Sequence, residues 1–366
     1  MDERAMNRRR LLGGIALTAG STAWIAAGTR SAEAAQAALP DMGTAQAPTL
    51  TDVKDKVAYI TGASSGIGLG IARVFHEAGM KVALGYRNEQ RLAEALTFFP
   101  KNDPRVYPVR HDVMDRDGWE RTADDIEKTL GPVQVLVNNA GVGLQAPAST
   151  GTYKDWEWGL GVNLWGPIYG VHTFVPRMLA SKLGSQIVTT TSTSGILPGS
   201  GAGIYTVAKI AAVGLMEELR LELRNTNIGT SAFIPGLTRT NIANSESYRP
   251  ESLKNDGAPA VAPGAPARTA TASTSAARSG GPSLEDIAMD PLESGRFLLN
   301  GILNNDLFIV THPEYRVGVE ARCNALLESM VPFTPVPPQR LRSNLYRSPI
   351  YVQEIAHRQA TRERKF

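Results

Sequence analysis

Cysteine is almost absent from the sequence, since Cys323 is the only one among 366 residues. A single cysteine excludes a disulfide within the chain and argues against a cysteine-based metal site. The five histidines are scattered without metal-ligand spacing, which indicates ordinary core or surface side chains. The excess of one charge sign is also small: the net charge is +3, and several positive residues lie at the two ends. This pattern is typical of a soluble protein with basic tails, and no basic face interleaved with aromatics indicates nucleic-acid binding.

The N-terminus is the most apolar stretch of the chain. Three arginines, Arg8–Arg10, precede a Gly/Ala-rich run without charge from Leu11 to Thr29. The run is too short and too rich in glycine for a comfortable membrane span. With the A-x-A pattern of Ala32–Ala34, it is similar to a bacterial twin-arginine export signal. We therefore expect a signal segment over 1–34, a linker over 35–52 and a location in the bacterial periplasm.

Three other interpretations of this N-terminus stay open. A disordered extension or a misassigned start codon would leave the protein in the cytoplasm, and a retained membrane anchor is the third. After signal removal we expect no stable membrane span.

The remaining sequence alternates between strand and helix patterns. The hydrophobic fraction of 42% suffices for a large core, and the length fits one large α/β domain with appendages or two small domains. Strand patterns cover Val57–Ile60, Val82–Leu84, Val106–Val109, Val133–Val137, Ile187–Thr190, Thr230–Ile234 and Leu307–Val310. Helical patterns cover Ile67–Ala78, Thr122–Leu130, Ala208–Arg224, Leu284–Leu303 and Tyr315–Met330. The alternation predicts one doubly wound, Rossmann-type α/β domain over 53–330, with a parallel sheet, helices on both faces, and ligands beyond the carboxyl ends of the strands.

Two regions interrupt this pattern. Residues Asn255–Pro282 are mostly Ala, Gly, Pro, Ser and Thr without any aromatic side chain, which predicts a flexible insertion. The insertion is either a lid over the substrate or a tolerated surface loop. Residues 331–366 read as a C-terminal tail, Pro-rich over Pro332–Pro338 and basic from Arg340 onward.

A glycine-rich turn, Thr61–Gly68, follows the first predicted strand and opens the first predicted helix. Such glycines let the backbone turn tightly and approach a pyrophosphate, which the N–H groups of the helix N-terminus bind. Gly68 allows the helix to pack closely on the strand. The turn predicts a dinucleotide site with contacts from Gly62, Ser64, Ser65, Gly66, Ile67 and Gly68.

The end of the second strand bears on the choice of nucleotide. An acidic residue there accepts a hydrogen bond from the ribose 2′-hydroxyl of NAD. Here Tyr86 stands in that place and Arg87 follows it, so no carboxylate repels a 2′-phosphate and Arg87 is able to pair with it. This favours NADP as the cofactor, with NAD possible. The alternative is a solvated Arg87 and a Tyr86 stacked on adenine, which would leave the specificity loose.

Tyr205 and Lys209 lie four residues apart, which places both on one face of a helix. A free tyrosine titrates near pH ~10, too high for efficient proton exchange at neutral pH. A nearby ammonium group favours the phenolate and lowers that pKa. The pair is therefore a candidate proton donor for reducing a carbonyl group.

The Thr-Gly-x-x-x-Gly-x-Gly turn and the Tyr-x-x-x-Lys pair together resemble the short-chain dehydrogenase/reductase family, over Val53 to Met330 without the insertion. The resemblance implies a catalytic tetrad of Asn163, Ser192, Tyr205 and Lys209, of which Tyr205 and Lys209 would also contact the cofactor. Ser192, thirteen residues before the tyrosine, would hydrogen-bond the substrate oxygen, with Ser194 as the alternative. Asn163 would hold a water that links Lys209 to solvent.

The resemblance also implies further contacts. Asp112 and Val113 would contact adenine, and the run Asn138–Gly141 would support the sheet and the adenosine side through Asn139, Ala140 and Gly141. Pro235, Gly236, Thr238 and Thr240 would hold the nicotinamide carboxamide and the phosphates, although Thr238 stands where the family usually has Val or Ile. Leu144, Gln145, Trp165, Ile196 and Leu197 would line the substrate pocket or belong to the core. Most of them are apolar, which favours a hydrophobic carbonyl or alcohol.

These features predict an NADP(H)-dependent oxidoreductase that interconverts a carbonyl and a secondary alcohol, with Tyr205 as general acid/base. The alternatives are a non-catalytic nucleotide-binding or scaffold protein, and an epimerase or dehydratase of the same family. The resemblance further implies a homodimer or homotetramer, formed through the helices that carry Asn163 and Tyr205. An exported enzyme of this kind would have to keep its cofactor tightly bound and regenerate it with a second substrate.

Overall fold

The computed structural model describes residues 43–199, 201–257, 287–330, 335–342 and 347–361. The predicted signal segment, most of the predicted insertion and parts of the predicted tail lie outside the described residues. Residues 1–44 and 45–366 are separate units, and the sheet and every described helix belong to the second one. Within the described ranges, no helix has the length and apolar character needed to cross a bilayer.

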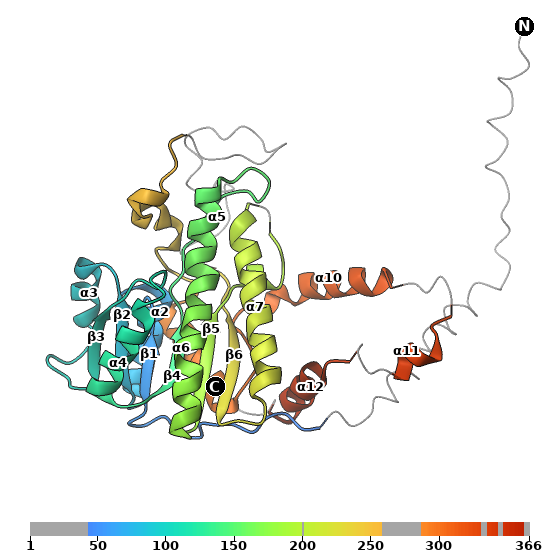
Figure 1. Ribbon diagram of the computed structural model, residues 1–366, viewed down its shortest axis with the longest axis horizontal. Helices are drawn as coiled ribbons and strands as arrows, with labels where there is room; N and C mark the ends of the chain where they lie inside the picture. The colour runs from blue at the N-terminus through green and yellow to red at the C-terminus, as the bar shows by residue number, and fades with distance from the viewer. Residues whose placement is uncertain (1–42, 200, 258–286, 331–334, 343–346, 362–366) are drawn as a thin grey trace, which may run out of the picture. The chain divides into compact units, whose positions relative to one another are not determined.

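A seven-stranded parallel sheet forms the centre of the second unit, with the order β3-β2-β1-β4-β5-β6-β7 (Figure 1). The strands are β1 (Val57–Ile60), β2 (Lys81–Tyr86), β3 (Val106–Arg110), β4 (Val133–Asn138), β5 (Ser185–Thr190), β6 (Ile228–Ile234) and β7 (Phe308–Val310). The predicted strands and the doubly wound fold are thus confirmed. The order changes direction between β1 and β4, and this point at the carboxyl edge is where such sheets bind ligands.

The described helices include those that cover the two faces of the sheet and those of the C-terminal part, which lie outside these two layers. They are α2 (Gly66–Glu77), α3 (Glu89–Leu96), α4 (Gly118–Leu130), α5 (Tyr153–Leu160), the π-helix η1 (Gly161–Trp165), α6 (Gly166–Ser181), α7 (Gly203–Leu223), α9 (Pro291–Asn304), α10 (Arg316–Glu328), α11 (Pro338–Arg342) and α12 (Pro349–Thr361). Short 3₁₀ segments are η2 (Thr193–Gly195), η3 (Ile242–Tyr248), η4 (Glu251–Leu253) and η5 (Pro313–Tyr315). Of the predicted helix 284–303, the part from Pro291 onward is helix α9, which continues to Asn304.

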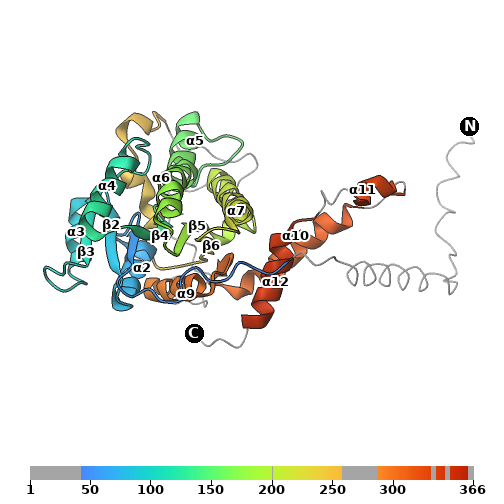
Figure 2. The same ribbon diagram turned by 60° about the horizontal axis from the view of Figure 1, so that its bottom comes forward.

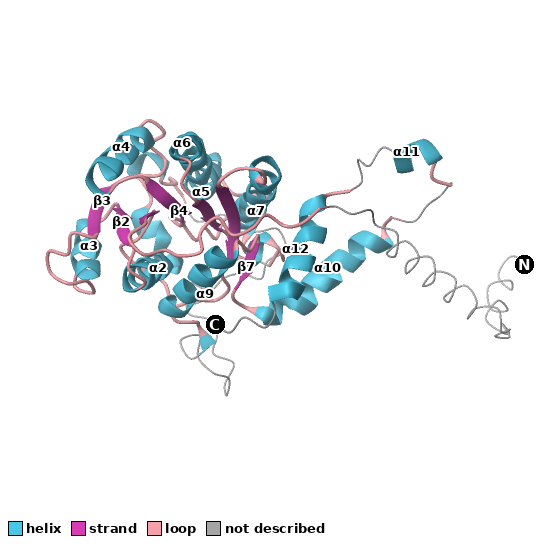
Figure 3. Ribbon diagram, turned by 90° about the horizontal axis from the view of Figure 1, so that it is seen from below, coloured by secondary structure: helices cyan, strands magenta, loops and turns pink. Residues whose placement is uncertain are grey.

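Each face of the sheet buries its own apolar core (Figure 3). Trp119 of α4, Trp158 of α5 and Phe174 of α6 pack on one face. Phe75 of α2 and Leu298 of α9 pack on the other. These side chains are almost completely buried, so each contributes roughly 1.5–3 kcal/mol of transfer free energy. The core thereby fixes the strand ends that carry the candidate site.

Helices α2 and α9 lie side by side because glycines remove the side chains between them (Figure 2). A Cβ atom on Gly70 would lie 2.2 Å from the carbonyl oxygen of Pro291, and one on Gly295 would lie 2.8 Å from that of Gly70. Helix α9 therefore supports α2, the helix that begins in the glycine-rich turn.

Helix α12 lies where the sequence indicated only a basic tail. His357 and Arg358 each approach the buried Asp306 carboxylate to 2.9 Å. The Glu354 carboxylate accepts a hydrogen bond of 3.2 Å from the backbone N–H of Leu307. Arg358 thus pairs with a buried carboxylate just before β7, and this pairing was not visible in the local sequence.

Candidate active site

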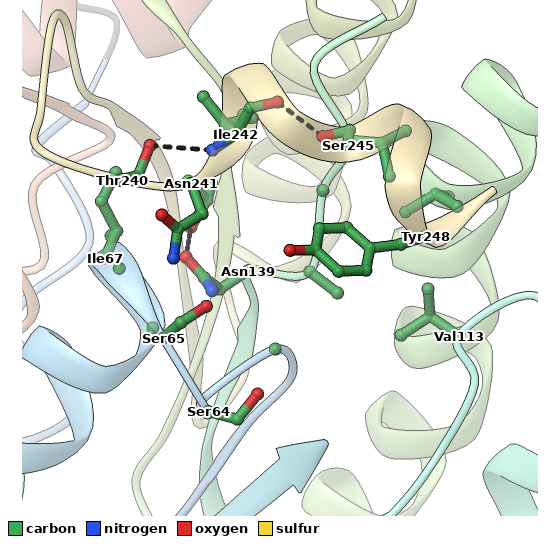
Figure 4. Close-up of a pocket in the computed structure, with 18 of the residues that line it drawn as sticks. Ser64, Ser65, Ile67, Val113, Asn139, Thr240, Asn241, Ile242, Ser245 and Tyr248 are labelled. Atoms are coloured by element: carbon green, nitrogen blue, oxygen red, sulfur yellow. Dashed lines mark hydrogen bonds between the residues drawn. The ribbon is translucent and has the colours of Figure 1, made fainter. Parts of the chain in front are cut away.

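A cavity of about 430 Å³ lies at the carboxyl ends of the strands (Figure 4). Residues that follow β1 through β6 line it, because the parallel strands all end at this edge. Every predicted nucleotide contact lies in its lining: Gly62, Ser64, Ser65, Gly66, Ile67, Gly68, Arg87, Asp112, Val113, Asn139, Ala140, Gly141, Tyr205, Lys209, Pro235, Gly236, Thr238 and Thr240.

The glycine-rich turn forms one wall of this cavity. Gly62 and Gly66 have φ angles of 67° and 54°, a region that favours glycine. The N-cap residue of α2, Ser65, makes no side-chain capping bond, so the first N–H groups of that helix are left for an anion. This geometry fits the pyrophosphate of a dinucleotide, since backbone donors and a positive helix end meet at a wall where glycines allow close approach.

Gly68→Ala is expected to weaken NADPH binding by about 5- to 150-fold. The new Cβ atom would lie 2.3 Å from the Gly62 carbonyl oxygen and 2.5 Å from Asn139 Nδ2, so the turn would have to open. Overpacking of this kind costs about 1–3 kcal/mol. The measurement is a fluorescence titration with NADPH. Gly214→Ala on α7 is the matched control, because nothing lies within 4 Å of its added Cβ atom. Unchanged affinity of the Gly68 variant would contradict the assignment of this wall.

Asn139 joins three strand ends below the turn. Its side-chain N–H donates to the Thr61 carbonyl oxygen at 3.0 Å, and its backbone N–H donates to Thr61 Oγ1 at 2.9 Å. The Thr190 hydroxyl in turn donates to Asn139 Oδ1 at 3.2 Å. These bonds hold β1, β4 and β5 in register at the cavity floor, so Asn139 supports the site as well as lining it.

Tyr205 and Lys209 project from α7 into the cavity, as their spacing predicted. The Lys209 ammonium lies 5.6 Å from the centre of the Tyr205 ring and donates to the Thr190 carbonyl oxygen at 2.8 Å. The Ser192 side chain lies at the end of β5 and hydrogen-bonds Tyr205. Ser194, the alternative to Ser192, is absent from the cavity lining, and its backbone N–H donates to Ser192 Oγ at 3.1 Å. The geometry therefore favours Ser192 over Ser194.

Burial shifts both titratable groups of this pair. It raises the pKa of Tyr205, and the hydrogen bond with Ser192 partly opposes this shift. It lowers the pKa of Lys209 to about 8. At neutral pH the lysine therefore still carries its proton, and its positive charge beside the phenol favours the phenolate form.

Asn163 lies behind the cavity wall and does not line the cavity. It belongs to the π-helix η1 between α5 and α6, and it is fully buried. Its side chain accepts from the Val142 N–H at 3.1 Å and donates to the Val142 carbonyl oxygen at 3.0 Å. A Cβ atom on Gly141 would lie 3.0 Å from Asn163 Oδ1 and 3.7 Å from Lys209 Nζ. Asn163 thus fixes the backbone beside Lys209, and its water-relay role stays a prediction.

The predicted substrate contacts do not line the described cavity. Leu144 belongs to the buried core, and Ile196 packs against that core. Trp165 is 49% exposed and stacks on Tyr169, and Gln145 is exposed. Leu197 packs against Gly318 of α10. Their role in substrate binding stays a prediction.

Several cavity residues were missed in the sequence. Arg91 lies one helical turn after Arg87, a spacing that could have indicated it. Asn241, Ile242, Ser245 and Tyr248 come from the irregular segment after β6, which carries no periodic signal. Figure 4 shows these four residues on the side of the cavity opposite Ser64 and Ser65.

Comparison with known proteins shows the family of the chain. A family model described as short chain dehydrogenase matches residues 56–250. A C alpha-dehydrogenase from Sphingobium is 33% identical over 289 residues, which cover 79% of this chain and 90% of that relative. A short-chain dehydrogenase/reductase from Burkholderia phymatum in complex with NAD is 32% identical, with a TM-score of 0.66 over 78% of this chain and 99% of that one. A putative short-chain dehydrogenase from Novosphingobium aromaticivorans is 28% identical, with a TM-score of 0.67 over 84% and 99% of the two chains.

Proposed function

The chain belongs to the short-chain dehydrogenase family, and on that premise we propose that it is an NADP(H)-dependent oxidoreductase that interconverts a carbonyl and a secondary alcohol. One observation carries the proposal. Tyr205, Lys209 and Ser192 line the same cavity as the glycine-rich turn. This arrangement would place a proton donor and the nicotinamide of a bound dinucleotide beside the same substrate.

The chain's own side chains would orient the substrate and move the proton. A bound nicotinamide supplies hydride exchange with the carbonyl carbon. The hydroxyl groups of Ser192 and Tyr205 would hold the carbonyl oxygen and stabilise the charge that develops on it. Tyr205 would donate its proton to that oxygen during reduction and accept it during oxidation. Lys209, held by the Thr190 carbonyl oxygen, would stabilise the phenolate that results.

The cofactor preference rests on the end of β2. Tyr86 of β2 pairs with Arg110 of β3, so the residues that follow the two strands, Arg87 and Asp112, lie close together. Arg87 lines the cavity, and its guanidinium lies 3.2 Å from the Asp112 carboxylate. An arginine at this place favours a 2′-phosphate, so NADP(H) is the proposed cofactor.

We expect NADPH to support a several-fold higher kcat/KM than NADH with apolar ketones. The measurement is a side-by-side assay that follows nucleotide absorbance with a panel of such carbonyl compounds. A clear preference for NADH would contradict the cofactor proposal. Nucleotide binding without turnover of any carbonyl or alcohol would instead contradict the proposed oxidoreductase function.

The proposed substrate is an apolar small molecule, and the proposed assembly is a homodimer or homotetramer. Large apolar side chains are exposed on η1, α6 and α7: Trp165, Leu179, Val207 and Ile210. A second copy packed on these helices would cover them, which supports the assembly.

Export through a twin-arginine signal also stays a proposal, since that segment lies outside the described residues. Export would carry the folded protein with its nucleotide bound. A second substrate would then regenerate the bound nucleotide.

A further inference from the structure

The segment from Asn241 to Asp256, here called the strap, lines one side of the cavity through Asn241, Ile242, Ser245 and Tyr248. We propose that Tyr248 of this strap is a specificity-determining residue, because it occupies the arginine donors that would otherwise bind the 2′-phosphate of NADP. The inference rests on the proposed function, since it concerns the nucleotide of the same site. Tyr248 would thereby set the ratio of NADP(H) affinity to NAD(H) affinity.

Two buried anchors hold the strap on either side of Tyr248. Ser245 is 3% exposed, and its hydroxyl oxygen accepts from the Gly143 N–H at 2.9 Å. Arg249 pairs with the buried Asp155 carboxylate of α5 and lies 4.5 Å from the Trp158 ring centre. Breaking such a buried pair typically costs about 3–5 kcal/mol. The strap is therefore fixed, and the position of Tyr248 follows from its neighbours.

Tyr248 bridges the cavity to the end of β2 and the start of α3. Its ring lies 4.3 Å from the Arg91 guanidinium, and its hydroxyl oxygen accepts a hydrogen bond from that guanidinium. Its backbone carbonyl accepts from Arg87 at 2.7 Å. All three residues line the cavity, and Figure 4 shows the Tyr248 ring reaching into it from η3. The bridge closes the cavity on the side of Arg87, where the adenosine half is proposed to lie.

The same guanidinium groups line the cavity and would serve as donors to a 2′-phosphate. A phosphate carries nearly two negative charges and accepts stronger hydrogen bonds than a phenol or a carbonyl oxygen. The competing ion pair between Arg87 and Asp112 is weak, because its side chains are 37% and 40% exposed. NADP(H) would therefore take Arg91 from Tyr248 and open the bridge, whereas NAD(H) would leave the bridge closed.

The test compares Tyr248→Phe with Arg91→Met in the full-length protein. Phe keeps the ring but removes the hydroxyl acceptor, which frees an Arg91 donor for the phosphate. Both variants lose the hydrogen bond between the Tyr248 hydroxyl and residue 91, which weakens the bridge, so both should release NADH faster. They should differ with NADPH: the Phe variant should bind it several-fold more tightly and the Met variant more weakly. The ratio of NADPH to NADH affinity should rise about tenfold in the Phe variant, which corresponds to one charge-assisted hydrogen bond.

The measurements are equilibrium titrations and stopped-flow dissociation rates with NADPH and with NADH. Tyr153→Phe is the matched control, because this tyrosine is 93% exposed and lies outside the cavity lining. A purely structural role of Tyr248 would change both nucleotides by the same factor, and that result would overturn the inference. Failure of the proposed function is distinguishable, because the wild-type protein would then show no nicotinamide-dependent turnover.

Discussion

Tyr205→Phe is expected to lower kcat for carbonyl reduction by about 10²–10⁴-fold, the usual contribution of a positioned general acid. The variant keeps the ring in its place on α7 but removes the proton that the carbonyl oxygen would receive. Nucleotide affinity should stay nearly unchanged, because the glycine-rich turn and the strap remain intact. Steady-state kinetics together with an NADPH titration separate these two quantities.

The control for this variant is Tyr153→Phe, the same chemical change at a side chain that is 93% exposed. Turnover of the Tyr205 variant close to that of the wild type would show that the proton comes from another group. In that case Ser192, which hydrogen-bonds Tyr205 and lines the same cavity, would be the next residue to test.

Lys209→Met is expected to lower kcat by about 10²-fold and to move the pH profile of alcohol oxidation upward. Oxidation needs the Tyr205 phenolate, and burial raises the pKa of this tyrosine. The oxidation rate should therefore rise with pH in the wild type. Removing the ammonium 5.6 Å from the ring removes a group that favours phenolate, so the rise should occur at a higher pH.

The measurement is kcat/KM for alcohol oxidation as a function of pH, which reports the groups of the free enzyme. Lys128→Met, at an exposed position of α4, is the matched control. An unchanged profile with a lowered rate would contradict the electrostatic role of Lys209. That result would leave it only a structural contact with the Thr190 carbonyl oxygen.

Local chemistry explains which parts of the site were predictable from the sequence. A glycine-rich turn between a strand and a helix indicates a close approach of the backbone to a phosphate. A four-residue spacing on a helix places two side chains on the same face. The glycine-rich turn and the Tyr205–Lys209 pair line one cavity, and their roles there stay predictions. Ser192 follows β5 and Thr240 follows β6, and both line the cavity because parallel strands end at the same edge of the sheet.

Features that depend on tertiary placement were not predictable. Tyr248 lies in a segment without periodicity, and its place in the cavity lining depends on tertiary contacts such as the Arg249–Asp155 pair and the Ser245 hydrogen bond. Helix α12 depends on Asp306, a residue distant in sequence. Leu144 shows a further reason, because an apolar side chain fits a core and a pocket equally well, and here it lies in the core.

The central claim is that this chain transfers hydride between a nicotinamide and a carbonyl carbon. The most direct test incubates the protein with NADPH deuterated at C4 of the nicotinamide and a panel of apolar ketones, followed by mass spectrometry of the alcohols. We expect deuterium on the carbinol carbon with the wild type and almost none with Tyr205→Phe. Tight NADPH binding without deuterium in any product would contradict the claim.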